Sequence, residues 1–135
     1  MRQYLLDSNA VSDLVRNPGG VIAQRIGELG EARVATSVIV ASEVRFGAEK
    51  KNSAKLTQQV KAVLASMEIL AYSPPADVTY GELRAQLERQ GRPIGALDLL
   101  IAAHALALNL TLVTGNLREF SRVPGLRVEN WLRTR

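Results

Sequence analysis

The chain has 135 residues, 47% of them hydrophobic and 22% charged, and its 17 Lys and Arg against 13 Asp and Glu give a formal net charge of +4. This size and composition indicate one folded domain, spanning residues 1–135, rather than a disordered chain. Because cysteine is absent, disulfide scaffolds, thiolate zinc sites, iron–sulfur clusters and cysteine nucleophiles are excluded.

Strand and helix patterns alternate along the chain. Short apolar runs predict strands at residues 3–6, 33–36, 68–72, 110–114 and, at an edge, 127–128. Helical spacing predicts helices from Ser8 or Asn9 to about 16, over 21–29, from Thr36 or Ser37 to about 50, and over 53–67, 78–90 and 96–108. Pro74 and Pro75 mark the expected start of the helix that contains 78–90. The alternation predicts an α/β fold with three layers, in which helices flank a mostly parallel central sheet.

Several polar and acidic residues follow the predicted strands or interrupt apolar helices. Asp7 follows the first predicted strand, and Asn116 lies two residues past the end of the last long one, so both belong to the carboxyl rim where parallel sheets bind ligands. Glu43 and Asp98 are each a lone charge within an apolar helical stretch. An unpaired buried charge is costly, so each requires a cation, a metal or hydrogen bonds.

Each acid also has a purely structural interpretation. Asp7 could be a turn or cap residue, and Asp98 could cap its helix or stabilise the first turn by its charge. Glu43 could pair with Arg45, Lys50 or another basic residue. Three acids on one rim favour a divalent cation instead, because like charges at close range repel. Oxygen ligands without cysteine indicate Mg²⁺ or Mn²⁺.

Other residues have more modest roles. His104 lies six residues after Asp98 in the same helix, on a different face, and is expected to be a packed or hydrogen-bonded core histidine. Trp131 is expected to anchor the core or a dimer edge.

The basic balance of the chain favours a polyanionic partner such as nucleic acid. The apolar tract 96–113 is interrupted by polar residues, and no secretory signal opens the chain, so a cytoplasmic protein without membrane spans is expected.

Four segments of the chain resemble, in order and spacing, the motifs of PIN-domain proteins and most closely VapC-type toxins. They are residues 5–9 (LLDSN), 42–47 (SEVRFG), 91–102 (GRPIGALDLLIA) and 112–120 (LVTGNLREF). The match covers nearly the whole chain. Each segment alone is weakly specific, whereas four in register are strongly so.

The resemblance implies a metal-dependent endoribonuclease that is the toxin of a toxin–antitoxin pair, acts as a homodimer and is silenced by a cognate antitoxin. Its metal ligands correspond to Asp7, Glu43 and Asp98, with Mg²⁺ or Mn²⁺ as the cofactor. The fourth catalytic position, often Asp in the family, is Asn116 here, with Glu119 nearby as an outer acid and Thr114 as a further hydroxyl on the rim. The departure at Asn116 leaves one or two metals open. RNA is the implied substrate, with transfer RNA the preferred class.

Three alternatives compete with this interpretation. A nuclease of the same fold could cut DNA or structured nucleic acid, and nothing in the sequence separates ribose from deoxyribose. A catalytically silent binding module is disfavoured by the retention of all three acids. A phosphoacceptor receiver domain would need two acids at the first strand end, whereas Asp7 is followed by Ser8 and Asn9.

Overall fold

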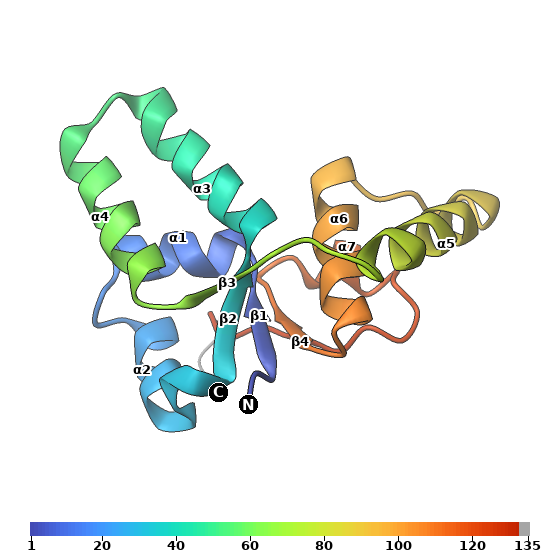
Figure 1. The fold of residues 1–135 in the computed structure, drawn as a ribbon, viewed down its shortest axis with the longest axis horizontal. Helices are drawn as coiled ribbons and strands as arrows, with labels where there is room; N and C mark the ends of the chain where they lie inside the picture. Colours follow the sequence, from blue (N-terminus) through green and yellow to red (C-terminus); the bar gives the residue numbers. More distant parts are fainter. Residues whose placement is uncertain (133–135) are drawn as a thin grey trace.

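The computed structural model describes residues 1–132 and contains one five-stranded sheet with helices on both sides (Figure 1). The strands are β1 (Tyr4–Leu6), β2 (Val34–Ser37), β3 (Glu68–Leu70), β4 (Thr111–Val113) and β5 (Val128–Glu129). Their order is β3-β2-β1-β4-β5 and every pairing is parallel. The α/β prediction is confirmed, and the sheet is wholly parallel within the described residues.

The helices are α1 (Ser8–Arg16), α2 (Val21–Leu29), α3 (Val38–Lys51), α4 (Ala54–Ala65), α5 (Ala76–Arg89), α6 (Ala96–Ala107) and α7 (Leu117–Phe120), with a short 3₁₀ turn over Glu31–Arg33. In Figure 1, α1 to α4 lie on one side of the sheet and α5 to α7 on the other. No helix within residues 1–132 is both long and apolar enough to cross a membrane.

The strand order places β1 at the centre and creates the position of the site. From β1 the chain builds outward through β2 to β3, and then returns to add β4 on the other side of β1. Ligands of such sheets bind at this reversal, beyond the carboxyl ends of the strands. Asp7 follows β1 and Thr114 follows β4, so both flank it.

Local boundaries differ from the sequence prediction at some element ends. The predicted cap of α1 was Ser8 or Asn9, but Asp7 caps it, accepting the Ala10 N–H at 3.1 Å. The predicted strand 68–72 ends at Leu70. These differences arise because caps and strand ends depend on tertiary partners as well as on local pattern. Helix α5, by contrast, has Pro75 at its N-cap, in agreement with the start expected at Pro74 or Pro75.

Trp131 lies in the core, only 3% exposed, with its ring edge-on to Tyr4 at 5.1 Å between centroids and Arg25 over its face. The apolar stripe of α4 is used largely by the protein's own core rather than left free for a dimer contact. Val60 and Leu64 are buried, and Leu56 and Val63 pack against that core. The homodimer therefore remains a prediction from the resemblance alone.

Helix α4 offers a test of the fold away from the rim. Ser53 caps α4 by accepting the Leu56 N–H at 3.1 Å. We expect Ser53→Ala to lower the free energy of unfolding by about 1 kcal/mol, and thermal melting by about 4 °C, in a domain of this size. Ser53→Asn, which keeps a capping oxygen, is the control and should melt close to the wild type. Equal losses in both variants would contradict the capping role.

Candidate active site

Asp7 is the buried centre of the candidate site. Its side chain is 4% exposed and sits where β1 passes into α1. Thr114 donates a hydrogen bond to it from the end of β4, and the Thr114 hydroxyl in turn accepts the Asn116 N–H at 2.9 Å. Burial raises the pKa of Asp7 above its ordinary value, the Thr114 and Ala10 hydrogen bonds oppose the rise, and the charge of Glu43 adds to it.

Glu43 reaches the same rim from α3. It is half-buried, and its Oε1 accepts a hydrogen bond from the Ser8 hydroxyl at 2.5 Å. The alternative in which Glu43 pairs with Arg45 or Lys50 is wrong, because the only ion pairs among residues 1–132 are Arg2–Glu68 and Arg84–Glu88. Glu43 is thus held by a neutral hydroxyl, and its negative charge is not cancelled within the described part of the chain.

Asp98 lies in the first turn of α6, but Gly95 is the residue at the N-cap. The expectation that Asp98 could stabilise this first turn therefore agrees with its position, although it is not the cap itself. Burial first, and then the charge of Glu119, raise the pKa of Asp98 to about 6, with smaller contributions from Glu43 and Asp7. All four carboxylates therefore act on one another electrostatically.

Glu119 and Asn116 form a clamp on the start of α6. Glu119 Oε1 accepts the Gly95 N–H at 2.8 Å, and the Asn116 amide donates to Oε2 at 3.2 Å. Hydrogen bonding from Gly95 is the main reason that the pKa of Glu119 lies below its ordinary value. A Cβ placed on Gly95 would lie 3.6 Å from Glu119 Oε1 and 4.0 Å from Asp98 Oδ2, so both carboxylates crowd the same point.

The structure thus gathers all four predicted site residues, Asp7, Glu43, Asp98 and Asn116, around the carboxyl ends of β1 and β4. Asn116 does so through the clamp and as the cap of α7, where its Oδ1 accepts the Glu119 N–H at 3.4 Å. The Ser8–Glu43 and Glu119–Gly95 hydrogen bonds were not predicted from the sequence, because each joins residues far apart in the chain. For the Glu119–Gly95 bond, the only signal was the position of Glu119 near Asn116.

Carboxylates and an amide are hard oxygen donors, which suit Mg²⁺ or Mn²⁺. Asp7, Glu43 and Asp98 form no ion pair among residues 1–132, and this fits a cation among them. Glu119 differs, because the positive charge of Arg122 helps to lower its pKa. The fit is one of chemistry rather than of a finished cage, because no three acidic or histidine side chains in that range are spaced as a ready metal site.

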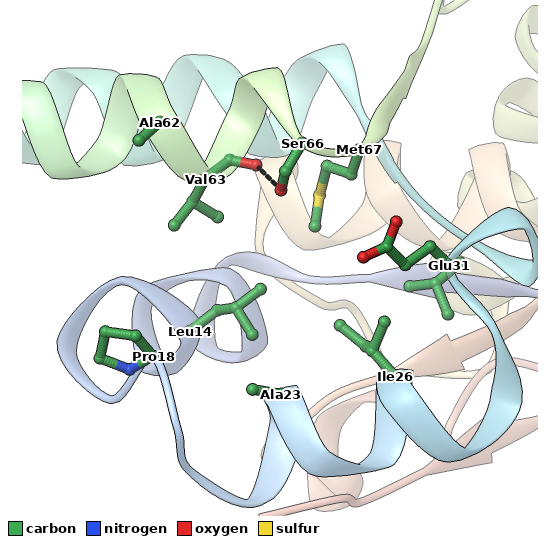
Figure 2. Close-up of a pocket in the computed structure, with 10 residues that line it drawn as sticks. Leu14, Pro18, Ala23, Ile26, Glu31, Ala62, Val63, Ser66 and Met67 are labelled. Carbon is green, nitrogen blue, oxygen red and sulfur yellow. Dashed lines mark hydrogen bonds between the residues drawn. The ribbon is translucent and has the colours of Figure 1, made fainter.

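Two grooves lie among helices α1 to α4. One, of about 320 Å³, opens at Ser8 and Glu43 and runs between α1, α3 and α4 past Lys51. The other, also about 320 Å³, is shown in Figure 2 and lies between α1, α2 and the end of α4. Its polar side chains are Glu31 and Ser66, and the Ser66 hydroxyl already donates to the Val63 carbonyl at 2.6 Å. Only the first groove reaches the acids.

Comparison with known proteins identifies the family of the chain. The family model for the PIN domain matches residues 4–126. "Ribonuclease VapC2" of Rickettsia felis is 44% identical over 130 residues, covering 95% of this chain and 97% of the relative. A "tRNA(fMet)-specific endonuclease VapC" of Salmonella typhimurium is 36% identical, with 97% and 99% covered.

Solved structures show the same likeness in three dimensions. The VapBC2 complex of Rickettsia felis bound to a DNA fragment from its promoter contains a chain with a TM-score of 0.89 and 37% identity, covering 95% of this chain and 98% of that one. DNA-bound VapBC of Salmonella typhimurium gives 0.88 and 36%, with 97% and 99% covered. The chain belongs to the PIN domain family and, within it, to the VapC ribonucleases of toxin–antitoxin pairs.

Proposed function

We propose that the protein is a divalent-metal-dependent endoribonuclease acting as the toxin of a toxin–antitoxin pair, with Asp7, Glu43 and Asp98 as metal ligands. The observation that carries the proposal is the convergence of Asp7, Glu43 and Asp98 from three separate elements at one end of the sheet. There, burial first and then the charges of neighbouring acids raise the pKa of Asp98 to about 6. A divalent cation would turn the repulsion between these acids into attraction. The Mg²⁺ or Mn²⁺ would supply charge stabilisation on the phosphate oxygens during phosphodiester hydrolysis.

The remaining residues orient this set. Thr114 and the Ala10 N–H hold Asp7, the Ser8 hydroxyl holds Glu43, and Asn116 holds Glu119 against the start of α6. Fixed rotamers keep the carboxylates directed at one place, which lowers the cost of organising them around a cation and substrate. Asn116 thus contributes as a positioning amide where the family often has a further acid.

Substrate attraction has a separate source, the positive surface. Arg45, Lys50 and Lys51 are exposed on α3, the helix that carries Glu43, and Lys51 lines the groove that opens at Ser8 and Glu43. Basic side chains beside an acidic centre draw in a polyanion while the metal contacts the scissile phosphate. The relatives named ribonuclease and tRNA(fMet)-specific endonuclease support RNA, and transfer RNA in particular, as the substrate.

A partner follows from the same family. The similar solved structures are VapBC complexes, which supports a cognate antitoxin bound to this chain. An antitoxin arginine reaching the carboxylates could replace the cation, since a guanidinium bridges carboxylates with two parallel hydrogen bonds. A complex that leaves these acids open to solvent would exclude this mode of inhibition. A cytoplasmic location completes the proposal.

Cleavage assays test the metal ligands directly. Purified protein should cut RNA with Mg²⁺ or Mn²⁺, and Asp7→Asn, Glu43→Gln and Asp98→Asn should each reduce the rate by about 100-fold or more while remaining folded. The matched control is Glu49→Gln, an exposed acid on the same helix as Glu43, which should keep the wild-type rate. Undiminished cleavage in excess chelator would overturn the metal claim.

Melting experiments separate a metal site from a structural acid cluster. Burial and neighbouring charge raise the folded-state pKa of Asp98 from 3.8 to about 6, so its ionisation opposes folding. Without metal, this group destabilises the protein progressively as the pH rises from about 4 through 6. In chelator at pH 7, Asp98→Asn should therefore melt higher than the wild type, and its gain should shrink at pH 5.

Added metal probes the same point from the other side. Mn²⁺ at 100 times its dissociation constant should stabilise the wild type by about 2.7 kcal/mol, and Asp98→Asn should show little of this shift. An Asp98→Asn variant that melts earlier than the wild type in chelator, with a wild type that ignores Mn²⁺, would mean that the acids are structural.

Expression in cells tests the toxin assignment. Induction of the wild type alone should arrest growth, and Asp98→Asn should not, because arrest requires cleavage. Sequencing the RNA ends formed shortly after induction identifies the substrate, and transfer RNA fragments are expected. DNA of matching sequence serves as the control in the purified assay. Growth without arrest would remove the toxin role, and preferential cutting of DNA would remove the RNA assignment.

A further inference from the structure

One buried polar pair is not used by the proposed chemistry. His104 on α6 is 1% exposed, and its Nδ1 lies 2.9 Å from the hydroxyl of Ser37, which is fully buried at the end of β2. The two residues are 67 positions apart in the chain. The expected core histidine is thus confirmed, and its hydrogen bond joins two elements that carry site acids.

Ser37 is placed where strand geometry passes into helix geometry. Its hydroxyl caps α3 by accepting the Ile39 N–H at 3.0 Å. The same oxygen is hydrogen-bonded to Nδ1 of His104, and the imidazole tautomer decides which of the two donates. The preceding residue, Thr36, donates to the Leu6 carbonyl at 2.8 Å, directly before Asp7. Ser37 therefore lies in the hydrogen-bonded layer that fixes the ends of β1 and β2.

His104 and Asp98 occupy different sides of the same helix. Six residues at about 100° each place them about 240° apart around the α6 axis, so that one side faces Ser37 and the core while the other faces the rim. Helices α3 and α6 contact each other, and α6 lies beside the start of α3 in Figure 1. Because α6 is rigid, a hydrogen bond that holds His104 on its inner side also holds Asp98, on its outer side, in place relative to Glu43 on α3.

A histidine is a costly way to fill this space. Its Nε2 is the only buried side-chain nitrogen or oxygen in residues 1–132 without a hydrogen-bond partner, although the Ala71 carbonyl lies near enough to influence the ring. The ring packs edge-on to Tyr72 at 5.1 Å between centroids, a contact that an apolar ring would also make. An unpaired buried nitrogen destabilises a fold, whereas a directional bond specifies one arrangement.

We propose that His104 is a positioning residue for the metal site, because its hydrogen bond to Ser37 sets the place of Asp98 on α6 against Glu43 on α3. This inference rests on the proposed function. It predicts that loss of the bond weakens metal binding more than it weakens RNA binding. A merely structural histidine would affect melting and leave metal binding unchanged.

Three variants distinguish a positioning role of His104 from a merely structural one. His104→Phe keeps the ring packing on Tyr72 and removes the bond, Ser37→Ala removes it from the other side, and His104→Asn keeps an acceptor near the position of Nδ1. The matched control is Ile22→Ala, a fully buried change on α2, which should lower melting without altering the site.

The measurement is the Mn²⁺ concentration that gives half of the maximal thermal stabilisation, a readout that needs no cleavage. We expect it to rise about 10-fold in His104→Phe and Ser37→Ala, by about as much in the double variant because both act on one bond, and under twofold in His104→Asn and Ile22→Ala. In cleavage assays the same variants should need correspondingly more Mn²⁺, with KM for RNA within twofold of the wild type.

The outcomes distinguish the two proposals. If His104→Phe and Ser37→Ala melt earlier yet bind Mn²⁺ like the wild type, His104 is structural and the inference is overturned while the nuclease stands. Ser37→Ala also removes the Ile39 cap of α3, so if His104→Phe does not fold, Ser37→Ala overturns the inference when it binds Mn²⁺ like the wild type. A wild type that neither responds to Mn²⁺ nor cuts RNA would overturn the proposed function, and this inference with it.

Discussion

The repulsion among four carboxylates at one end of the sheet is the constraint on which the candidate site depends. Asp7 is almost fully buried, and the charge of Glu43 helps to raise its pKa. The charges of Glu119, Glu43 and Asp7 in turn help to raise the pKa of Asp98. Burial of like charges costs stability unless something compensates for it. For Asp7 and Glu43, the compensation within the described chain comes from hydroxyls and a backbone N–H, none of which carries a positive charge. Glu119 is stabilised by the Gly95 N–H, the Asn116 amide and the charge of Arg122. The proposed divalent cation would supply the positive charge that Asp7, Glu43 and Asp98 lack.

The fold brings these groups together by a simple route. The strands are only two to four residues long. A helix follows β1 and β2 directly and follows β4 within a few residues. A parallel sheet directs those ends to one edge, and helices α1, α3 and α7 begin there with Asp7, Ser37 and Asn116 as their caps. Capping and site building therefore use the same positions, which is why residues with small polar side chains dominate the rim.

The sequence predicted the arrangement where it depends on strand order and failed where it depends on side-chain contacts. Asp7 and Asn116 could be placed because each follows an apolar run, and Glu43 and Asp98 stood out as lone charges in apolar helices. The cap of α1 was assigned one or two residues late, since Asp7, Ser8 and Asn9 are all good caps and only the packing of β1 selects among them. The Ser8–Glu43, Glu119–Gly95 and Ser37–His104 bonds span 24 to 67 residues, and no local pattern encodes them.

Structural and chemical roles need not exclude each other for these acids. Asp7 caps α1 through Oδ1, and Asp98 lies in the first turn of α6, where the helix dipole favours a negative charge. Each helix start thus offsets part of the cost of holding a carboxylate at the rim before any metal binds. The offset is incomplete, because the pKa of both side chains remains raised. Ionised carboxylates held at such a cost would gain stability from a divalent cation, and this is the property that the proposed metal site requires.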